Sequence, residues 1–139
     1  MPGPDEAELV PRVSIVVPML DAAGRVGPLH ARLAPLLDGP LRPGELILVD
    51  DGSADATWAE IRAVASTDER VVGLRLGSNV GQTGALCAGF SVARGEVVVM
   101  MDDDLEADPA DAVRFIEAVR AGADFASGRR TGPRAPVRA

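Results

Sequence analysis

The sequence contains no lysine: all 14 of its Lys and Arg residues are arginines. The absence of lysine excludes a P-loop, whose lysine contacts nucleotide phosphates, and Schiff-base catalysis, which needs an amine. The one cysteine, Cys87, cannot form an internal disulfide, which predicts a reducing compartment. The one histidine, His30, cannot supply a multi-histidine metal site. His30 and Cys87 both fall in predicted helices, where we expect structural roles.

Aromatic residues make up only 3% of the chain, and its 47% hydrophobic residues are mainly Val, Leu, Ile and Ala. This composition is typical of a buried parallel sheet covered by helices. The net charge of −7 disfavours nucleic acid and anionic lipid as main partners, but allows a phosphate-bearing ligand held through a cation. Apolar stretches such as Val13–Leu20 are far shorter than the ~20 residues of a membrane span, and Met1–Glu8 does not resemble a signal peptide. We therefore expect a cytoplasmic protein, for which any association with the cytoplasmic face of the membrane would be peripheral.

Strand and helix patterns alternate along the chain, which predicts a mostly parallel α/β sheet with right-handed crossovers. The predicted strands are 13–17, 45–49, 71–76, 96–101 and a short fifth strand at 124–127. The predicted helices are 27–37, a helix that ends near 65, 81–94 and 109–120. We expect residues 1–11 to be a disordered leader, 12–130 one domain and 131–139 a flexible tail.

Acidic residues follow three of the four longer predicted strands. Asp21 follows the first, Asp50 and Asp51 follow the second, and Asp102–Asp104 with Glu106 follow the fourth. In an open parallel sheet ligands bind beyond the carboxyl ends of the strands, so these acids should share one edge. Crowded carboxylates resist ionisation, and a bound Mg²⁺ or Mn²⁺ removes this cost while bridging to substrate phosphates. An acidic loop that is only a solvated turn or a helix cap is the alternative interpretation.

Two further segments have both a structural and a functional interpretation. Asp50-Asp51-Gly52-Ser53 is typical of a tight turn that caps the next helix, and a carboxylate there can also accept hydrogen bonds from a base or ribose. The small residues of Asn79–Gly84 open a helix, where a backbone can approach a phosphate. This segment is not a GxGxxG, so the dinucleotide fingerprint is absent. Arg129 and Arg130 either pair with phosphates or belong to a solvated tail.

Four ordered motifs resemble those of family-2 glycosyltransferases with the GT-A fold: VSIVVPMLDAA, ELILVDDGSADAT, GSNVGQTGALCAGFSVARG and VVVMMDDDLEADP. The last motif is similar to the Asp-Ala-Asp-Leu-Gln pattern of the polyprenyl-phosphate hexosyltransferase branch, and Gly128-Arg129-Arg130 matches its Gly-x-Arg. The resemblance covers residues 12–130 and implies a Rossmann-like, nucleotide-sugar-binding domain that is truncated on the acceptor side. It also implies inverting transfer of a hexose from a GDP- or UDP-sugar to a polyprenyl phosphate, with Mg²⁺ or Mn²⁺ as cofactor.

The resemblance also implies roles for individual residues. The implied substrate contacts are Pro18, Asp21, Asp50, Asp51, Asn79, Gly81, Asp103 and Arg130; the implied metal ligands are Asp102, Asp104 and Glu106, with Asp104 also catalytic. The sequence departs from the family at Asp21-Ala22, where Asn-Glu is usual, and at Glu106, where Gln is commoner.

Two other functions compete with transfer. A truncated or degenerate transferase domain would bind nucleotide without transferring sugar. A receiver-like signalling domain would also place acids at strand ends, but such domains rely on a lysine, which this chain lacks. Homodimerisation is compatible with sugar transfer and with nucleotide binding alone.

Overall fold

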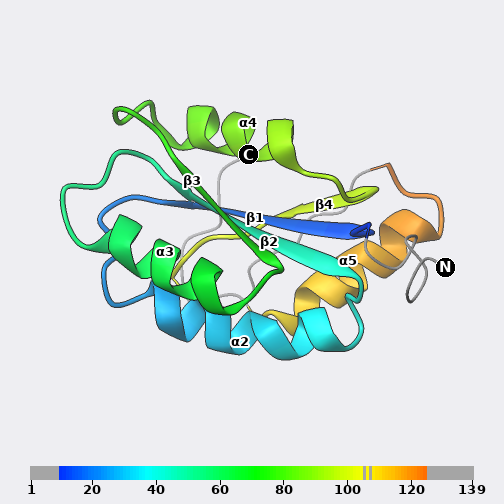
Figure 1. The fold of residues 1–139 in the computed structure, drawn as a ribbon. Coiled ribbons are helices and arrows are strands. Elements are labelled where there is room, and N and C mark those ends of the chain that lie inside the picture. The colour runs from blue at the N-terminus through cyan, green and yellow to red at the C-terminus, as the bar shows by residue number, and fades with distance from the viewer. Residues whose placement is uncertain (1–9, 105, 107, 125–139) are drawn as a thin grey trace, which may run out of the picture.

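A computed structural model describes residues 10–104, 106 and 108–124 of the chain. Its centre is a parallel four-stranded sheet with strand order β3-β2-β1-β4. Helices α2, α3 and α5 cover one face of the sheet and α4 covers the other (Figure 1). The strands are β1 (Val13–Met19), β2 (Gly44–Asp50), β3 (Val71–Arg75) and β4 (Val97–Met100), and the helices are α2 (Val26–Asp38), α3 (Thr57–Thr67), α4 (Gln82–Val92) and α5 (Ala110–Arg120).

The two central strands are apolar along nearly their whole length because both of their faces are covered. Ile15, Val17 and Met19 of β1 join the core beneath α2, α3 and α5. Val16 points the opposite way and packs with Ile47 beneath α4. This alternation is the period of two that a β-strand imposes on its side chains.

The predicted parallel α/β fold is confirmed, and the first four predicted strands and four predicted helices are present with ends within two residues of their expected bounds. The third helix illustrates the size of these shifts: it begins at Gln82 rather than 81 and ends at Val92 rather than 94. The fifth predicted strand at 124–127, apart from Asp124, and the predicted tail at 131–139 lie outside the described residues, as does most of the predicted leader.

A buried acid fastens the edge strand β4 at the amino end of the sheet. Glu45, which is 1% exposed, accepts hydrogen bonds from Ser14 Oγ at 2.6 Å and from the backbone N–H of Arg94 at 2.8 Å. Ser14 Oγ in turn accepts a bond from Gly95 N at 2.8 Å. These bonds fix the α4–β4 connection against β1 and β2, so this carboxylate has a structural function.

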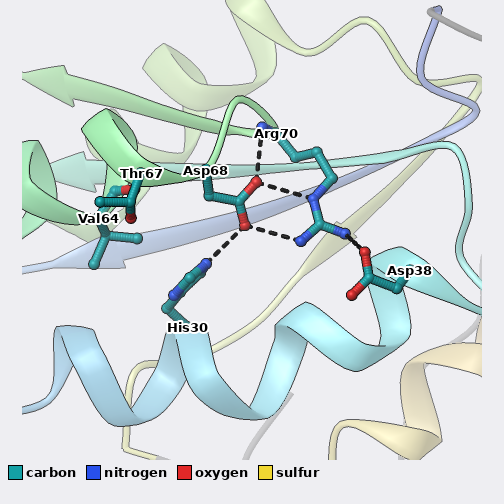
Figure 2. A network of polar contacts seen from close by, with 6 residues as sticks. All are labelled: His30, Asp38, Val64, Thr67, Asp68 and Arg70. Atoms are coloured by element: carbon teal, nitrogen blue, oxygen red, sulfur yellow. Dashed lines mark hydrogen bonds and ion pairs between the residues drawn. The ribbon is translucent and has the colours of Figure 1, made fainter.

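A polar network joins α2 to the connection between α3 and β3 (Figure 2). The Asp68 carboxylate lies between His30, whose Nε2 is 2.8 Å from Oδ2, and Arg70, whose Nε and Nη2 both lie at 2.9 Å. Arg70 also pairs with Asp38 at the end of α2. The Arg70 hydrogen bonds lower the pKa of Asp68 well below its usual range, while partial burial opposes them and His30 contributes less. His30 therefore lies in a network that holds two helices together.

The lowered pKa of Asp68 makes stability depend on pH. Since the folded-state pKa lies below the unfolded one, the stabilisation is fully present above about pH 4 and is lost as the pH falls further. We expect Asp68→Asn to lower the free energy of unfolding by about 1–3 kcal/mol at pH 7, and by progressively less below pH 4. Urea denaturation at several pH values measures this difference. A difference independent of pH between 7 and 3 would contradict the assignment.

Gly89 sets the close approach of α4 to the sheet. A Cβ at this position would overlap the Val16 side chain and lie 3.2 Å from Val49 Cγ2. We expect Gly89→Ala to lower the free energy of unfolding by about 1–3 kcal/mol, because overpacking outweighs the better helix propensity of Ala. Gly27 in α2 is the matched control, since a Cβ there meets nothing within 4 Å. Gly27→Ala should leave stability unchanged or slightly raised in the same urea titration.

Candidate functional site

Asp51 uses both carboxylate oxygens to hold the segment that precedes α4. Its Oδ1 accepts a hydrogen bond from Val80 N at 2.8 Å and its Oδ2 accepts one from Gly81 N at 3.1 Å. The Asp51 backbone N–H donates to Met19 O at 2.8 Å, so the residue also extends the β1–β2 pairing. Asp51 is 3% exposed. Its carboxylate therefore positions the start of α4 against the end of β2.

Asp50, directly before it, keeps one oxygen without a hydrogen bond. Its Oδ1 accepts a bond from Ser53 N at 3.0 Å, which closes the turn predicted for this motif. Its Oδ2 is buried and has no hydrogen-bond partner within the described part of the chain. Arg75 Nε lies 3.9 Å away, and the Arg75 guanidinium also stacks over Trp58 at 5.9 Å from the ring centroid. A buried carboxylate oxygen with an incomplete shell is suited to accept a hydrogen bond from a ligand.

The loop between β1 and α2 is fixed by side chains of the loop and helix that follow β2. Four consecutive backbone N–H groups, those of residues 21–24, each donate to an oxygen at 2.8–3.1 Å. Their acceptors are Ser53 Oγ, Thr57 Oγ1, Asp55 Oδ2 and the Glu60 carboxylate, in chain order. Hydrogen bonds from Thr57 are the main cause of a lowered pKa at Asp55.

Asp21 itself adopts a left-handed backbone conformation with φ of 47°. Its Oδ1 accepts a hydrogen bond from Ala54 N at 2.9 Å, so this side chain contributes to the same loop contact. Pro18 lies in β1 beside Val49 of β2 and is half-buried. The first predicted motif therefore lies directly against the loop that carries Asp50 and Asp51.

The three acids after β4 point to different neighbours. Asp102 and Asp104 are exposed, whereas the Asp103 side chain is 17% exposed and lies 3.7 Å from Arg25 Nη1. Asp102 Oδ1 lies 3.4 Å from Gln82 Nε2, and Asp104 Oδ1 accepts a bond from Glu106 N at 3.0 Å. Burial raises the pKa of Asp103, Arg25 opposes this, and the neighbouring acids add to it.

The acids that follow β2 and those that follow β4 come together at the start of α4. Asp51 binds Gly81 N, and the next residue, Gln82, reaches Asp102. Asn79 Oδ1 also accepts a bond from Gly81 N at 3.0 Å. The structure thus brings Asp51, Asn79, Gly81 and Asp102 into one neighbourhood. Arg130, the remaining predicted contact, lies outside the described residues.

The described residues contain no group of three or more His, Cys, Asp or Glu side chains that could hold a metal by themselves. Mg²⁺ usually binds through one or two carboxylates together with substrate phosphates, rather than in an all-protein cage. Asp102 and Asp104 are both exposed, so their carboxylates are accessible to a metal held in that way.

Three residues of this edge were not predicted from the sequence: Arg25, Arg75 and Gln82. Arg75 is the last residue of β3 and was therefore identifiable from its position at a strand end. Gln82 lies inside the small-residue segment that the sequence singled out. For Arg25 no local pattern gives a signal, because its partner Asp103 lies 78 positions further along the chain.

Residues 14–138 match the model of glycosyl transferase family 2. The chain belongs to this family. The prediction made from its four motifs is thereby confirmed. Because the match spans nearly the whole chain, the carboxyl edge of the sheet described above lies within the matched region.

Two curated relatives of the family carry polyprenyl phosphates in their names. The chain is 35% identical over 113 residues to undecaprenyl-phosphate 4-deoxy-4-formamido-L-arabinose transferase of Aeromonas hydrophila, covering 81% of this chain and 35% of the relative. It is 42% identical over 102 residues to dodecaprenyl-phosphate galacturonate synthase of Rhizobium johnstonii, covering 71% of this chain and 30% of the relative. The chain thus spans about a third of the length of these relatives.

A solved structure with a similar fold is a mannosyltransferase of Pyrobaculum calidifontis in complex with GDP-Man and Mn²⁺. The likeness has a TM-score of 0.64 at 24% identity and covers 77% of this chain and 32% of that one. At this identity the likeness concerns the fold, and it confirms the predicted GT-A architecture. Within the residues that the structure describes, no helix has the length and apolar character needed to cross a membrane.

The different surroundings of Asp50 and Asp51 predict unequal effects of mutation on folding. We expect Asp51→Ala to lower the free energy of unfolding by about 2–3 kcal/mol, because it removes the acceptor of the Val80 N–H and one of the two acceptors of the Gly81 N–H. We expect Asp50→Asn to change it by less than about 1 kcal/mol, since Asn keeps the acceptor for Ser53 and removes a buried charge. Urea denaturation of both variants measures the contrast. Equal destabilisation by the two substitutions would refute it.

Proposed function

We propose that this chain forms the donor-binding region of an inverting glycosyltransferase that transfers a hexose from a nucleoside-diphosphate sugar to a polyprenyl phosphate. The observation that carries the proposal is the meeting of the acids after β2 and β4 at the start of α4. The names of the two curated relatives support a polyprenyl phosphate as acceptor. The complex of the similarly folded mannosyltransferase with GDP-Man and Mn²⁺ supports a nucleotide-sugar donor with a divalent metal.

On the nucleotide side, Asp50 is the proposed base- or ribose-binding acid. Its Oδ2 is buried and needs a donor, which an N–H of a base or a ribose hydroxyl supplies. Asp51 is proposed to act beside it by holding the backbone of Val80 and Gly81 against the ligand. Pro18 and Asp21 are proposed to border the nucleotide on the side of β1.

On the phosphate side, Asp102, Asp104 and Glu106 are the proposed ligands of Mg²⁺ or Mn²⁺. When bound, such a metal supplies Lewis-acid stabilisation of the charge that develops on the leaving nucleoside diphosphate. Asp104 is proposed as the acid nearest to the reacting centre. Arg130 is proposed to contact the phosphates, as its match to the Gly-x-Arg motif implies.

The proposed reaction inverts the configuration of the sugar. An oxygen of the acceptor phosphate attacks the anomeric carbon, while the bond from that carbon to the leaving phosphate oxygen breaks. A hydroxyl acceptor would need a general base to remove its proton. A lipid phosphate is already anionic at neutral pH, so this chain needs to supply only binding and orientation of the donor.

A second candidate function is nucleotide binding without transfer. Both candidates require the same donor site. They differ only in whether a sugar leaves it.

Calorimetry with UDP and GDP, with and without Mn²⁺, tests the shared site. We expect one nucleotide to bind, and to bind at least tenfold more weakly without Mn²⁺, because the metal bridges the diphosphate to the protein. Asp50→Asn and Asp104→Asn should each weaken binding by tenfold or more. Glu69→Gln is the matched control. It removes an exposed acid just before the amino end of β3, whereas the proposed site lies at the carboxyl ends of the strands, so it should leave binding unchanged.

Transfer is then measured with the matching nucleotide sugar and a polyprenyl phosphate in detergent. Formation of the polyprenyl-phosphate sugar would establish the transferase. Metal-dependent binding without product would select the binding function instead. Loss of binding in the Glu69→Gln variant as strong as in Asp50→Asn, or no binding of either nucleotide by the native chain, would refute the donor site.

A further inference from the structure

The acidic segment after β4 is held from both faces of the sheet. On the α4 side, Gln82 Nε2 lies 3.4 Å from Asp102 Oδ1. On the opposite side, Arg25 Nη1 lies 3.7 Å from Asp103 Oδ1. Arg25 immediately precedes α2, so the second contact joins the start of that helix to the segment that follows β4.

Burial alternates along this segment in the same phase as in β4. Val99 is buried and Met101 is half-buried in the core beneath α2 and α5, and Asp103 follows them at the same two-residue spacing. The intervening residues Met100 and Asp102, and Asp104 after them, are more exposed. Asp103 is thus turned toward α2, while its two neighbours face solvent.

Arg25 offsets part of the free-energy cost of burying the Asp103 carboxylate. The Asp103 side chain retains 17% of its exposure and lies between two other acids, whose charges repel it. A guanidinium within ion-pair distance offsets part of this repulsion and of the lost hydration. Arg25 Nη2 also lies 3.5 Å from the carbonyl oxygen of Asp21, so its side chain spans from the β1–α2 loop to the acidic segment.

We propose that Arg25 and Asp103 are positioning residues whose ion pair orients the acidic segment so that Asp102 and Asp104 face the divalent cation. Asp103, which the family resemblance implied as a substrate contact, then contacts neither the cation nor the substrate. The inference rests on the proposed function for the identity of the ligand, and on the observed contact for its mechanism. It assigns to the middle acid of the motif a role that the linear sequence does not reveal.

The Mn²⁺ affinity of an Arg25→Gln variant, measured with the nucleotide that the native chain binds, tests the proposal. Loss of an orienting partner behind a metal ligand typically weakens metal binding by about tenfold or more, and we expect a decrease of this size. Electrostatics alone predicts the opposite sign, since removal of a positive charge near the site should strengthen cation binding. An unchanged or increased Mn²⁺ affinity in Arg25→Gln would overturn the proposal.

Four further variants isolate the ion pair: Arg25→Lys, Asp103→Asn, the double variant of Arg25→Gln with Asp103→Asn, and Arg114→Gln. Arg25→Lys should restore most of the affinity, because an ammonium can still pair with Asp103. The double variant with Asp103→Asn and Arg25→Gln should bind Mn²⁺ no more weakly than the weaker single variant, as expected for two residues that act as one unit. Arg114→Gln, which removes the partner of Asp111 on α5, is a charge-matched control and should leave the affinity unchanged. Additive losses in the double variant would contradict the ion-pair mechanism.

Hydrogen exchange without metal provides a readout that does not depend on the proposed function. We expect the amides of residues 102–104 to exchange several times faster in Arg25→Gln than in the native chain, because the segment loses its contact with Arg25. Exchange at β1 and β2 should be unchanged. If the native chain binds no metal–nucleotide complex but exchange still accelerates, the proposed function fails and the positioning contact stands. If exchange is unaffected, the positioning contact fails.

Discussion

The carboxyl edge of this sheet depends on the hydrogen bonds that Asp51 accepts from Val80 and Gly81. These two bonds fix the connection before α4 against the end of β2 and thereby set where the helix begins. Gly52 makes the approach tight, since a Cβ there would lie 2.7 Å from Asn79 N, and its φ of 78° is open to glycine at little cost. The position of Gln82, and through it the contact with Asp102, follows from this junction.

Much of the fold was predictable because its signals are local. The apolar runs of β1 and β2 predicted buried strands, and the glycines and prolines between them predicted the connections. Element ends shifted by at most two residues, as at β4, where the expected 96–101 became Val97–Met100. β4 pairs with β1 only from Val97 to Met100, opposite Val13 to Val16, although β1 itself continues to Met19.

The site was predictable as a set of acids but not as a set of contacts. The position of Asp50 and Asp51 at a strand end is visible in the sequence, and so is the acidity of Asp102–Asp104. Their orientations depend on partners that are distant in the chain, such as Gly81 for Asp51 and Arg25 for Asp103. Sequence patterns identify the residues that reach an edge, whereas packing decides which atoms remain available to a ligand.

The acids that follow β2 and those that follow β4 have different functions within each segment. After β2, both carboxylate oxygens of Asp51 accept hydrogen bonds from backbone N–H groups, and the neighbouring Asp50 keeps one buried oxygen without a donor among the described residues. After β4, Asp103 is turned to Arg25, and the acids on either side of it are exposed. An acid that holds its segment in place lets its neighbour remain incompletely satisfied, because the backbone of both is then fixed. The doubled and tripled acids therefore need not all bind ligand: we infer that part of each cluster maintains the geometry in which the rest can do so.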